Sequence, residues 1–295
     1  MDHHHRHEQG GIDYDRAFAI GIALNLVYVI GEAAAGALSG SLALLADAGH
    51  NLGDVLGLGL AWGAAVLSRR QPSTRFTYGL RSTSILAALA NAIILLVVTG
   101  GVAWEAIRRF AHPVPVPGDV IVWVAMIGIA VNGGTALLFA SGRTRDLNLK
   151  SAFLHMAGDA LVTAGVVVAG LAIGLFGWLW LDPAVGLVVS GVIVFGTWGL
   201  LKSAIGLALD AVPEGVGAAA VSTHLAALPG VAALHDVHIW GVNTTETALI
   251  CHLAMPGGHP GDAALNAIAA ELHARFGIAH TTIQIESPTA TRYAC

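Results

Sequence analysis

The chain has 295 residues, of which 55% are hydrophobic and only 11% are charged. About a quarter of a soluble domain is normally charged, so this composition excludes an ordinary soluble protein and indicates a membrane protein. The net charge of −5 argues against a nucleic-acid partner, which favours a basic stripe. The two cysteines, Cys251 and Cys295, form no Cys-x-x-Cys motif, so a metal site must use His and carboxylate side chains.

The chain begins with a polar, His-rich segment, residues 1–13, which has no apolar region of the kind found in a cleavable signal peptide. Its histidines could belong to a cloning tag or to the natural protein. Because Arg6 interrupts the run of histidines, we expect a native, flexible tail.

Six apolar segments follow, and each is long enough to cross about 30 Å of hydrocarbon as a helix. Their Gly and Ala content would let membrane helices approach closely. We therefore predict an all-α bundle of six transmembrane helices over residues 14–209. The segments lie near 17–38, 42–67, 82–104, 117–141, 151–176 and 181–207.

The Lys and Arg residues between these segments predict the orientation, because cytoplasmic loops carry an excess of positive charge. With the N-terminus inside, the outer loops carry only Arg108 and Arg109. The inner loops carry Arg69, Arg70, Arg75, Arg81, Arg143, Arg145 and Lys150. We expect a multi-pass protein of the cell (inner) membrane with both termini in the cytoplasm.

After Pro213 the composition changes, and residues 210–288 read as a small cytosolic α/β domain ahead of a short tail, 289–295. The predicted order is αββαβ, which suggests a small ferredoxin-like sheet with helices on one face. The elements are expected near 214–228, 232–241, 246–255, 261–276 and 281–286.

Ionisable residues gather in only a few of the predicted spans. Each costs roughly 2.5–3.5 kcal/mol on insertion and is therefore a candidate functional residue. The first span contains Glu32, the second Asp47, His50 and Asp54, and the fifth His155 and Asp159.

Two of these groups share one spacing, His-x-x-x-Asp, which places both side chains on one face of a helix, one turn apart. Two such helices facing each other would supply four N/O ligands, a set that suits tetrahedral Zn²⁺. The two carboxylates would also neutralise one divalent ion, which matters where an uncompensated charge is costly.

Other interpretations of these polar residues are open. A His–Asp pair can form a hydrogen bond between membrane helices, although the repeated spacing disfavours this for both pairs. Glu32 could make a structural hydrogen bond or transfer protons. Asp47 lies three residues before His50, and we favour a supporting or pathway role over direct ligation, because four ligands are already present.

These residues lie within motifs that resemble the cation diffusion facilitator family, in its bacterial and vertebrate zinc-transporter branch. The resemblance covers about residues 15–288 and implies a six-helix bundle, a cytosolic domain, a homodimer and metal/proton exchange. Carried over residue by residue, it makes His50, Asp54, His155 and Asp159 the transport ligands. The matching positions are 41–50, Asp54, 76–79, Asn91, 155–159, Asp182-Pro183 and 235–240.

The sequence departs from the family pattern in two places. The Arg-x-Glu that usually starts the third helix is replaced by Ser82 and Ser84, with Arg81 one position early. The fourth loop lacks the His-rich run of many relatives, and the N-terminal tail could serve instead.

A second set of candidate ligands lies in the soluble domain. His235 and His252 should be opposite each other around a turn at Asn243-Thr244, with Cβ atoms about 5 Å apart. On the last strand, His280, Gln284 and Glu286 share one face by the two-residue period. The resemblance points to His235, His252 and Glu286 as regulatory metal ligands with His280 nearby; the alternative is a set of solvated surface histidines.

The sequence therefore predicts a secondary transporter that exports Zn²⁺, with Cd²⁺ and Co²⁺ as further candidates, in exchange for protons. Zinc would be both the substrate and a regulatory ligand, and we expect no organic cofactor. No P-loop motif is present to couple ATP hydrolysis. An intramembrane zinc hydrolase would need an open metal position and a His-Glu-x-x-His motif, which is absent. A membrane metal sensor would have little reason to place four ionisable ligands in the bilayer.

Overall fold

The structure is a computed structural model that describes residues 14–140 and 147–286. The predicted His-rich tail, the C-terminal tail and the two loop arginines, Arg143 and Arg145, lie outside the described residues. Two compact units make up the chain: residues 1–56 with 94–195, and residues 57–93 with 196–295.

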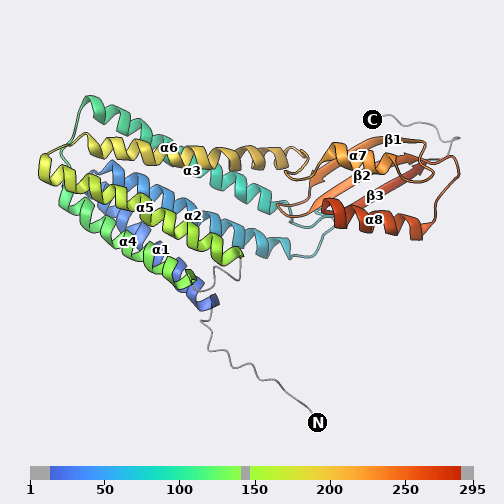
Figure 1. The fold of residues 1–295 in the computed structure, drawn as a ribbon, viewed down its shortest axis with the longest axis horizontal. Coiled ribbons are helices and arrows are strands. Elements are labelled where there is room, and N and C mark those ends of the chain that lie inside the picture. Colours follow the sequence, from blue (N-terminus) through green and yellow to red (C-terminus); the bar gives the residue numbers. More distant parts are fainter. Residues whose placement is uncertain (1–13, 141–146, 287–295) are drawn as a thin grey trace, which may run out of the picture. The chain divides into compact units, whose positions relative to one another are not determined.

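Long helices form the first two thirds of the chain, as predicted (Figure 1). Among the described residues, five helices are long and apolar enough to cross a membrane, and the searched part of the first, Ala23–Ser39, is a shorter apolar helix. The helices are α1 (Tyr14–Ser39), α2 (Leu42–Ser68), α3 (Thr83–Ala111), α4 (Gly118–Ala140), α5 (Leu147–Phe176) and α6 (Leu181–Ala208).

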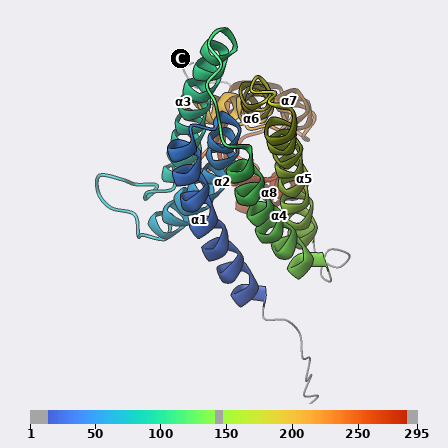
Figure 2. The ribbon, with the colours of Figure 1, turned by 90° about the vertical axis from the view of Figure 1, so that its left-hand side faces the viewer.

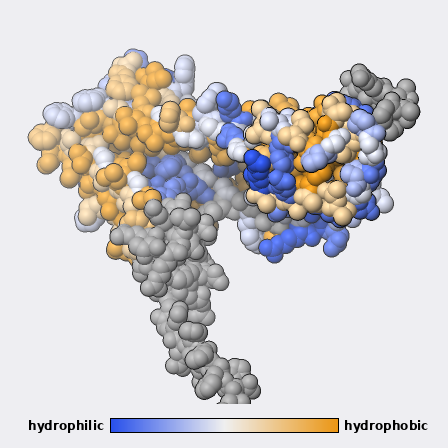
Figure 3. Space-filling model, turned by 45° about the vertical axis from the view of Figure 1, so that its right-hand side comes forward, coloured by the Kyte–Doolittle hydropathy of each residue, from blue (hydrophilic) through white to orange (hydrophobic). Residues whose placement is uncertain are grey.

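Apolar side chains cover much of the visible surface of these helices, in orange in Figure 3. Val97, Leu161 and Phe195, for example, are 69%, 76% and 87% exposed. In water, so much exposed apolar surface would be unfavourable and prone to association. The surface is instead suited to contact with lipid hydrocarbon, which agrees with the composition.

In the first unit, α4 and α5 run side by side and pack closely through glycines (Figures 1 and 2). A Cβ atom on Gly118 would lie only 2.5 Å from the carbonyl oxygen of Gly170 and 2.7 Å from the nitrogen of Gly174. The absent side chains allow the two backbones to meet, as small residues commonly do in membranes. The adjoining core joins α2, α4 and α5 and consists of Ala43, Leu44, Val116, Ile121, Ala125, Val166 and Ile173.

The start of α2 is fixed by Asp182, a buried carboxylate in the first turn of α6. Its oxygens accept hydrogen bonds from the Ser41 hydroxyl (2.5 Å) and from the backbone N–H groups of Leu42 (2.8 Å) and Ala43 (3.2 Å). These are free N–H groups of the first turn of α2, so a negative charge is favourable there. The contact sets where α2 begins, eight residues before His50.

The C-terminal domain has the predicted αββαβ order. The elements are α7 (Ala218–Ala226), β1 (Ala233–Gly241), β2 (Thr247–Ala254), α8 (Asp262–Phe276) and β3 (Ile278–Glu286). Strands β1 and β2 are antiparallel, β2 and β3 are parallel, and the sheet order is β1-β2-β3. The last strand begins at Ile278, three residues earlier than predicted.

Both helices of this domain contribute to one core, which covers a single face of the sheet. Leu249, Cys251 and Leu253 alternate along β2 and are buried against Leu225 of α7 and Leu272 of α8. Because alternate residues of a strand point to opposite faces, His252 lies on the other side. The polar residues of the strands therefore gather on the face away from the helices.

Candidate metal sites

The two His-x-x-x-Asp pairs lie on α2 and α5, both within the first unit. Each pair is spaced by one helical turn, so each helix presents its imidazole and carboxylate on one face. The structure brings the two faces together, as the repeated spacing predicted. Three of the side chains, His50, Asp54 and Asp159, offer ligand atoms that all lie within 4.8 Å of one another.

The shortest contacts run crosswise, from each imidazole to a carboxylate of the other helix. His50 Nε2 lies 3.1 Å from Asp159 Oδ1, within hydrogen-bond distance. His155 Nε2 lies 3.1 Å from Asp54 Oδ2 and 3.7 Å from Asp159 Oδ2. The two contacts of His155 have the distance of an ion pair but not the angle of a hydrogen bond, because Asp54 Oδ2 and Asp159 Oδ2 have no hydrogen-bond partner.

The arrangement suits a tetrahedral ion after small side-chain movements. Ligands about 2.0–2.1 Å from a Zn²⁺ ion lie roughly 3.4 Å apart in a tetrahedron, close to the separations seen here. The two imidazole rings are farther apart, with centroids 6.3 Å from each other. His155 is 45% exposed and Asp159 only 6%, so the four side chains extend from an exposed imidazole to a buried carboxylate.

Asp47 is fully buried and does not join the group of ligand atoms. Its Oδ2 accepts a hydrogen bond from the Thr163 hydroxyl at 3.0 Å, and that hydroxyl also lies 2.9 Å from the backbone oxygen of Asp159. Thr163 thus links Asp47 to the residue that carries a candidate ligand. Nothing in the sequence pattern singled out Thr163, because a threonine in a membrane helix is not by itself unusual.

The cytosolic candidates His235, His252 and Glu286 also come together, on the open face of the sheet. His235 is paired with His252 across β1 and β2, as predicted from the turn. Glu286 Oε2 lies 2.9 Å from His235 Nε2, and its Oε1 lies 3.0 Å from His252 Nδ1. Two imidazoles and a carboxylate at these distances form a three-ligand set of the kind that binds zinc.

Asp236 is a neighbour of this cluster that sequence reasoning missed. Its Oδ2 lies 3.3 Å from His252 Nε2, although strand alternation would point it to the opposite face from His235. The reason is a β-bulge between His235 and His238, at which Asp236 has a φ of 52°. Bulges redirect side chains, and Asp tolerates the left-handed conformation better than most residues.

His280 does not lie with these residues. It is six positions before Glu286 on β3, roughly 20 Å along a strand that rises about 3.3 Å per residue. Its Nε2 instead lies 3.4 Å from Glu246 Oε2 and 3.1 Å from Arg81 Nη1. Sharing a face of β3 was therefore insufficient to bring His280 to the cluster.

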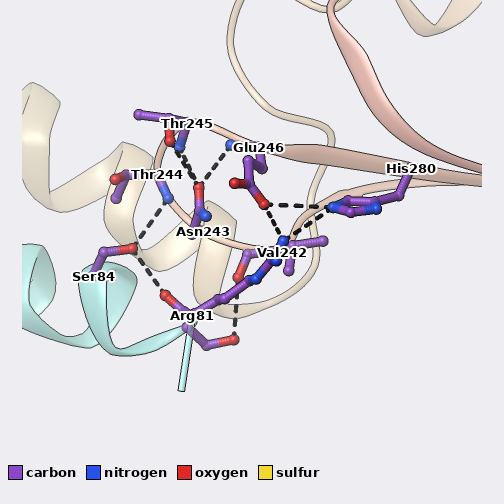
Figure 4. A network of polar contacts seen from close by, with 9 residues as sticks. Arg81, Ser84, Val242, Asn243, Thr244, Thr245, Glu246 and His280 are labelled. Carbon is purple, nitrogen blue, oxygen red and sulfur yellow. Dashed lines mark hydrogen bonds and ion pairs between the residues drawn. The ribbon is translucent and has the colours of Figure 1, made fainter. Parts of the chain in front are cut away.

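The residues that replace the usual Arg-x-Glu make contacts of their own, all within the second unit (Figure 4). Arg81 Nη1 donates to Glu246 Oε2 at 2.5 Å. The Ser82 hydroxyl donates to the Val242 carbonyl at 3.3 Å. The Ser84 hydroxyl accepts from the backbone N–H of Thr244 at 3.2 Å. The start of α3 is thus fastened to the β1–β2 connection by three separate bonds.

Comparison with known proteins agrees with this architecture. A helical membrane unit with facing His/Asp pairs, followed by a small α/β domain, is typical of metal-ion transporters. Residues 18–207 match the family model "Cation efflux transmembrane domain", and residues 213–288 match "Cation efflux protein, cytoplasmic domain". The chain belongs to the cation diffusion facilitator family, in its zinc-transporter branch.

Several relatives are similar over nearly their whole length. The zinc transporter ZitB of Shigella flexneri is 36% identical, covering 100% of this chain and 96% of the relative. The cation efflux system protein CzcD of Alcaligenes sp. is 32% identical (96% and 89% covered). The "cadmium, cobalt and zinc/H(+)-K(+) antiporter" of Bacillus velezensis is 32% identical (97% and 92% covered). This is a family of cation transporters and not of enzymes, so the hydrolase alternative is wrong.

Proposed function

We propose that this chain exports Zn²⁺, with Cd²⁺ and Co²⁺ as further substrates, from the cytoplasm in exchange for protons. The observation that carries the proposal is the convergence of His50 and Asp54 from α2 with His155 and Asp159 from α5, among apolar helices. The names of the relatives, which include zinc transporters and a cadmium, cobalt and zinc/H(+)-K(+) antiporter, support the same function.

The ligand set supplies the chemistry of exchange. Two carboxylates neutralise one divalent ion, so the loaded site carries no formal charge into the low-dielectric interior. His and Asp bind either a metal or a proton, so metal binding releases protons and proton binding releases metal. In the metal-free protein the crosswise His–Asp contacts would hold protonated imidazoles against carboxylates, which keeps the empty site compensated as well.

The domain boundaries, orientation and assembly follow from the same proposal. We take residues 14–209 as the transmembrane domain and residues 210–288 as a cytosolic domain. The protein would lie in the inner membrane of the cell, with both termini in the cytoplasm. The match of 213–288 to a cytoplasmic family domain supports this division, and its family label, a dimerisation domain, supports a homodimer.

The cluster of His235, His252 and Glu286 would bind zinc as a regulatory ligand. It lies on the domain that faces the metal being exported, so its occupancy would report the cytoplasmic zinc concentration. This part of the proposal is supported by the distances of about 3 Å from the two Glu286 oxygens to His235 and His252.

The test is zinc flux into sealed proteoliposomes that contain a zinc dye and a pH dye. Wild-type protein should move zinc into the lumen and protons out of it, and an imposed gradient, acidic inside, should accelerate zinc entry. His155→Ala should abolish both signals, whereas the same change at the exposed His259 should leave both intact. Zinc flux that ignores the pH gradient would indicate a passive channel and overturn the proposal.

A further inference from the structure

Two carboxylic acids are buried beside the transport site and are not among its ligands. Glu32 of α1 and Asp47 of α2 are each 1% exposed. The described residues place no Lys or Arg against them, and their carboxyl groups lie within hydrogen-bonding reach of each other. Such a pair is costly in a membrane interior and marks a functional site by default.

Three of the four carboxyl oxygens of Glu32 and Asp47 already accept a hydrogen bond. The Tyr28 hydroxyl donates to Glu32 Oε1 at 2.6 Å, and Asn51 Nδ2 donates to Glu32 Oε2 at 3.3 Å. The Thr163 hydroxyl donates to Asp47 Oδ2 at 3.0 Å. Because these groups present hydrogen atoms rather than lone pairs, the surroundings disfavour a metal ion between the two carboxylates.

The fourth oxygen provides an independent observation. Asp47 Oδ1 is buried and has no hydrogen-bond partner. A buried acceptor without a donor is costly, and the cost disappears if the neighbouring carboxyl carries a proton and donates it. One proton held between two adjacent carboxyl groups also removes the repulsion between two like charges in a low-dielectric site.

We propose that Glu32 and Asp47 share one proton in the metal-free protein and release it to solution when zinc binds, as a proton site additional to the four metal ligands. This inference rests on the proposed zinc/proton exchange and adds to it a specific contribution to the number of protons exchanged. No other reactant is needed: the proton leaves as zinc arrives and returns as zinc departs.

The titratable groups that face the pair indicate how zinc would displace this proton. They are Tyr28 on α1, His50 on α2 and Asp159 on α5. Helix α4 contributes only Asp119, an exposed residue in its first turn. His50 and Asp159 are themselves candidate zinc ligands, so a bound divalent ion would place positive charge close to the pair.

Two direct connections strengthen this link. Thr163 contacts both the Asp47 carboxylate and the backbone of Asp159. Asn51, which contacts Glu32, directly follows His50 on α2. A change in the positions of the ligands on zinc binding would therefore reach both carboxyl groups. Positive charge nearby favours the ionised form of a carboxyl group, so zinc binding and proton loss would be coupled.

The test compares proton release by wild-type protein with that of Glu32→Gln, in the purified full-length protein. Calorimetry of zinc binding in buffers with different heats of ionisation counts the protons released. Glutamine accepts from Tyr28 and donates to Asp47, so it imitates the protonated pair permanently. We expect Glu32→Gln to bind zinc but to release about one proton fewer. The slope of the logarithm of zinc affinity against pH should therefore be smaller by about one, which is a factor of about ten in affinity per pH unit.

Asp47→Asn provides a second, separate variant, and it should also release about one proton fewer per zinc ion than the wild type. In the double variant the number of protons released should fall no further than in either single variant, because the pair holds only one proton. Glu105→Gln, which changes a carboxylate bonded to Arg108 and Arg109, is the matched control and should release the wild-type number. Infrared spectroscopy of the wild-type protein should show a protonated-carboxyl band that zinc removes.

The outcomes are distinct. An unchanged proton count in both Glu32→Gln and Asp47→Asn would overturn the shared proton. Wild-type protein without a protonated-carboxyl band at neutral pH would overturn it without any variant. Zinc binding to wild-type protein that released no protons at all would instead contradict the proposed zinc/proton exchange.

Discussion

His50 Nε2 lies 3.1 Å from Asp159 Oδ1, a contact between side chains that are 109 residues apart. The bond joins α2 to α5, and the contact between His155 and Asp54 joins the same helices in the opposite sense. In the absence of metal, each imidazole is therefore held by the carboxylate of the other helix. A metal ion would replace both contacts at once, so its arrival changes how the two helices are connected.

Asp159→Asn should abolish zinc transport while leaving the protein folded. The amide has nearly the same size, but it removes one of the two negative charges and the only buried carboxylate among the four ligands. Loss of a group that merely supports a ligand costs about 10–100-fold in affinity, so we expect at least that loss here. The measurement is zinc binding and zinc flux in proteoliposomes.

The control for this experiment is Asp119→Asn, which makes the same change at an exposed carboxylate in the first turn of α4. It should transport zinc at the wild-type rate. Normal zinc flux through Asp159→Asn would rule out the four-ligand site.

The sequence was sufficient to predict that the side chains of α2 and α5 converge, because two physical signals coincide there. Charged groups in apolar spans are costly, and the repeated i, i+4 spacing places them on helical faces. The pairing of His235 with His252 was predictable from the position of the turn. From the pair Gly241–Thr247, however, His235 lies six residues along β1, whereas His252 lies only five residues along β2. The bulge supplies the difference.

Other features depend on packing and could not be read from the sequence. The crosswise pairing of histidines and aspartates requires the relative placement of α2 and α5. Asp236 reaches His252 only because of its positive φ, which alternation does not reveal. His280 meets Arg81, 199 residues away in the chain, and no local pattern connects the two.

An impermeant thiol reagent should label the protein at Cys295 only after the cells are opened. The other cysteine, Cys251, is fully buried on β2, and burial raises the pKa of its thiol to about 11. Since the thiolate is the reactive form, this lowers its reactive fraction about a hundredfold relative to a pKa of 9. Cys251→Ser should therefore label like wild type, and labelling of intact cells would reverse the predicted orientation.

The bond between Arg81 and Glu246 should contribute little to stability. Both side chains are more than one third exposed, and exposed ion pairs are worth about 0.2–1 kcal/mol. A double-mutant cycle with Arg81→Ala and Glu246→Ala, measured by unfolding in detergent, should give a coupling energy in that range. High salt should weaken it. A coupling above about 2 kcal/mol would show that this contact belongs to a strongly cooperative network.

His235→Ala combined with His252→Ala should remove about one bound zinc ion per full-length chain and retain measurable zinc transport. The change deletes both imidazoles of the cytosolic cluster but leaves the membrane ligands in place. Zinc stoichiometry at equilibrium is the measurement. His259→Ala, an exposed position without a cluster, is the control. An unchanged stoichiometry would mean that these histidines are ordinary surface residues.

His50→Asp should raise the flux of Cd²⁺ relative to Zn²⁺. Two imidazoles and two carboxylates suit tetrahedral Zn²⁺, whereas Mg²⁺, Ca²⁺ and Mn²⁺ prefer larger shells of oxygen and should be poor substrates of the wild type. Cd²⁺ is larger than Zn²⁺ and tolerates a looser set of oxygen ligands. Replacing an imidazole with a carboxylate relaxes the geometry and removes the contact of His50 with Asp159.

The expected change in the Cd²⁺/Zn²⁺ flux ratio is about threefold, which corresponds to a shift in relative binding of about 0.65 kcal/mol. The added carboxylate leaves the loaded site with a net negative charge, so both absolute rates should fall even as the ratio rises. His112→Asp makes the same change at an exposed residue after α3 and should leave the ratio unaltered. If His50→Asp also leaves it unaltered, the packing of the helices around the site sets selectivity, and the nitrogen ligand of α2 does not.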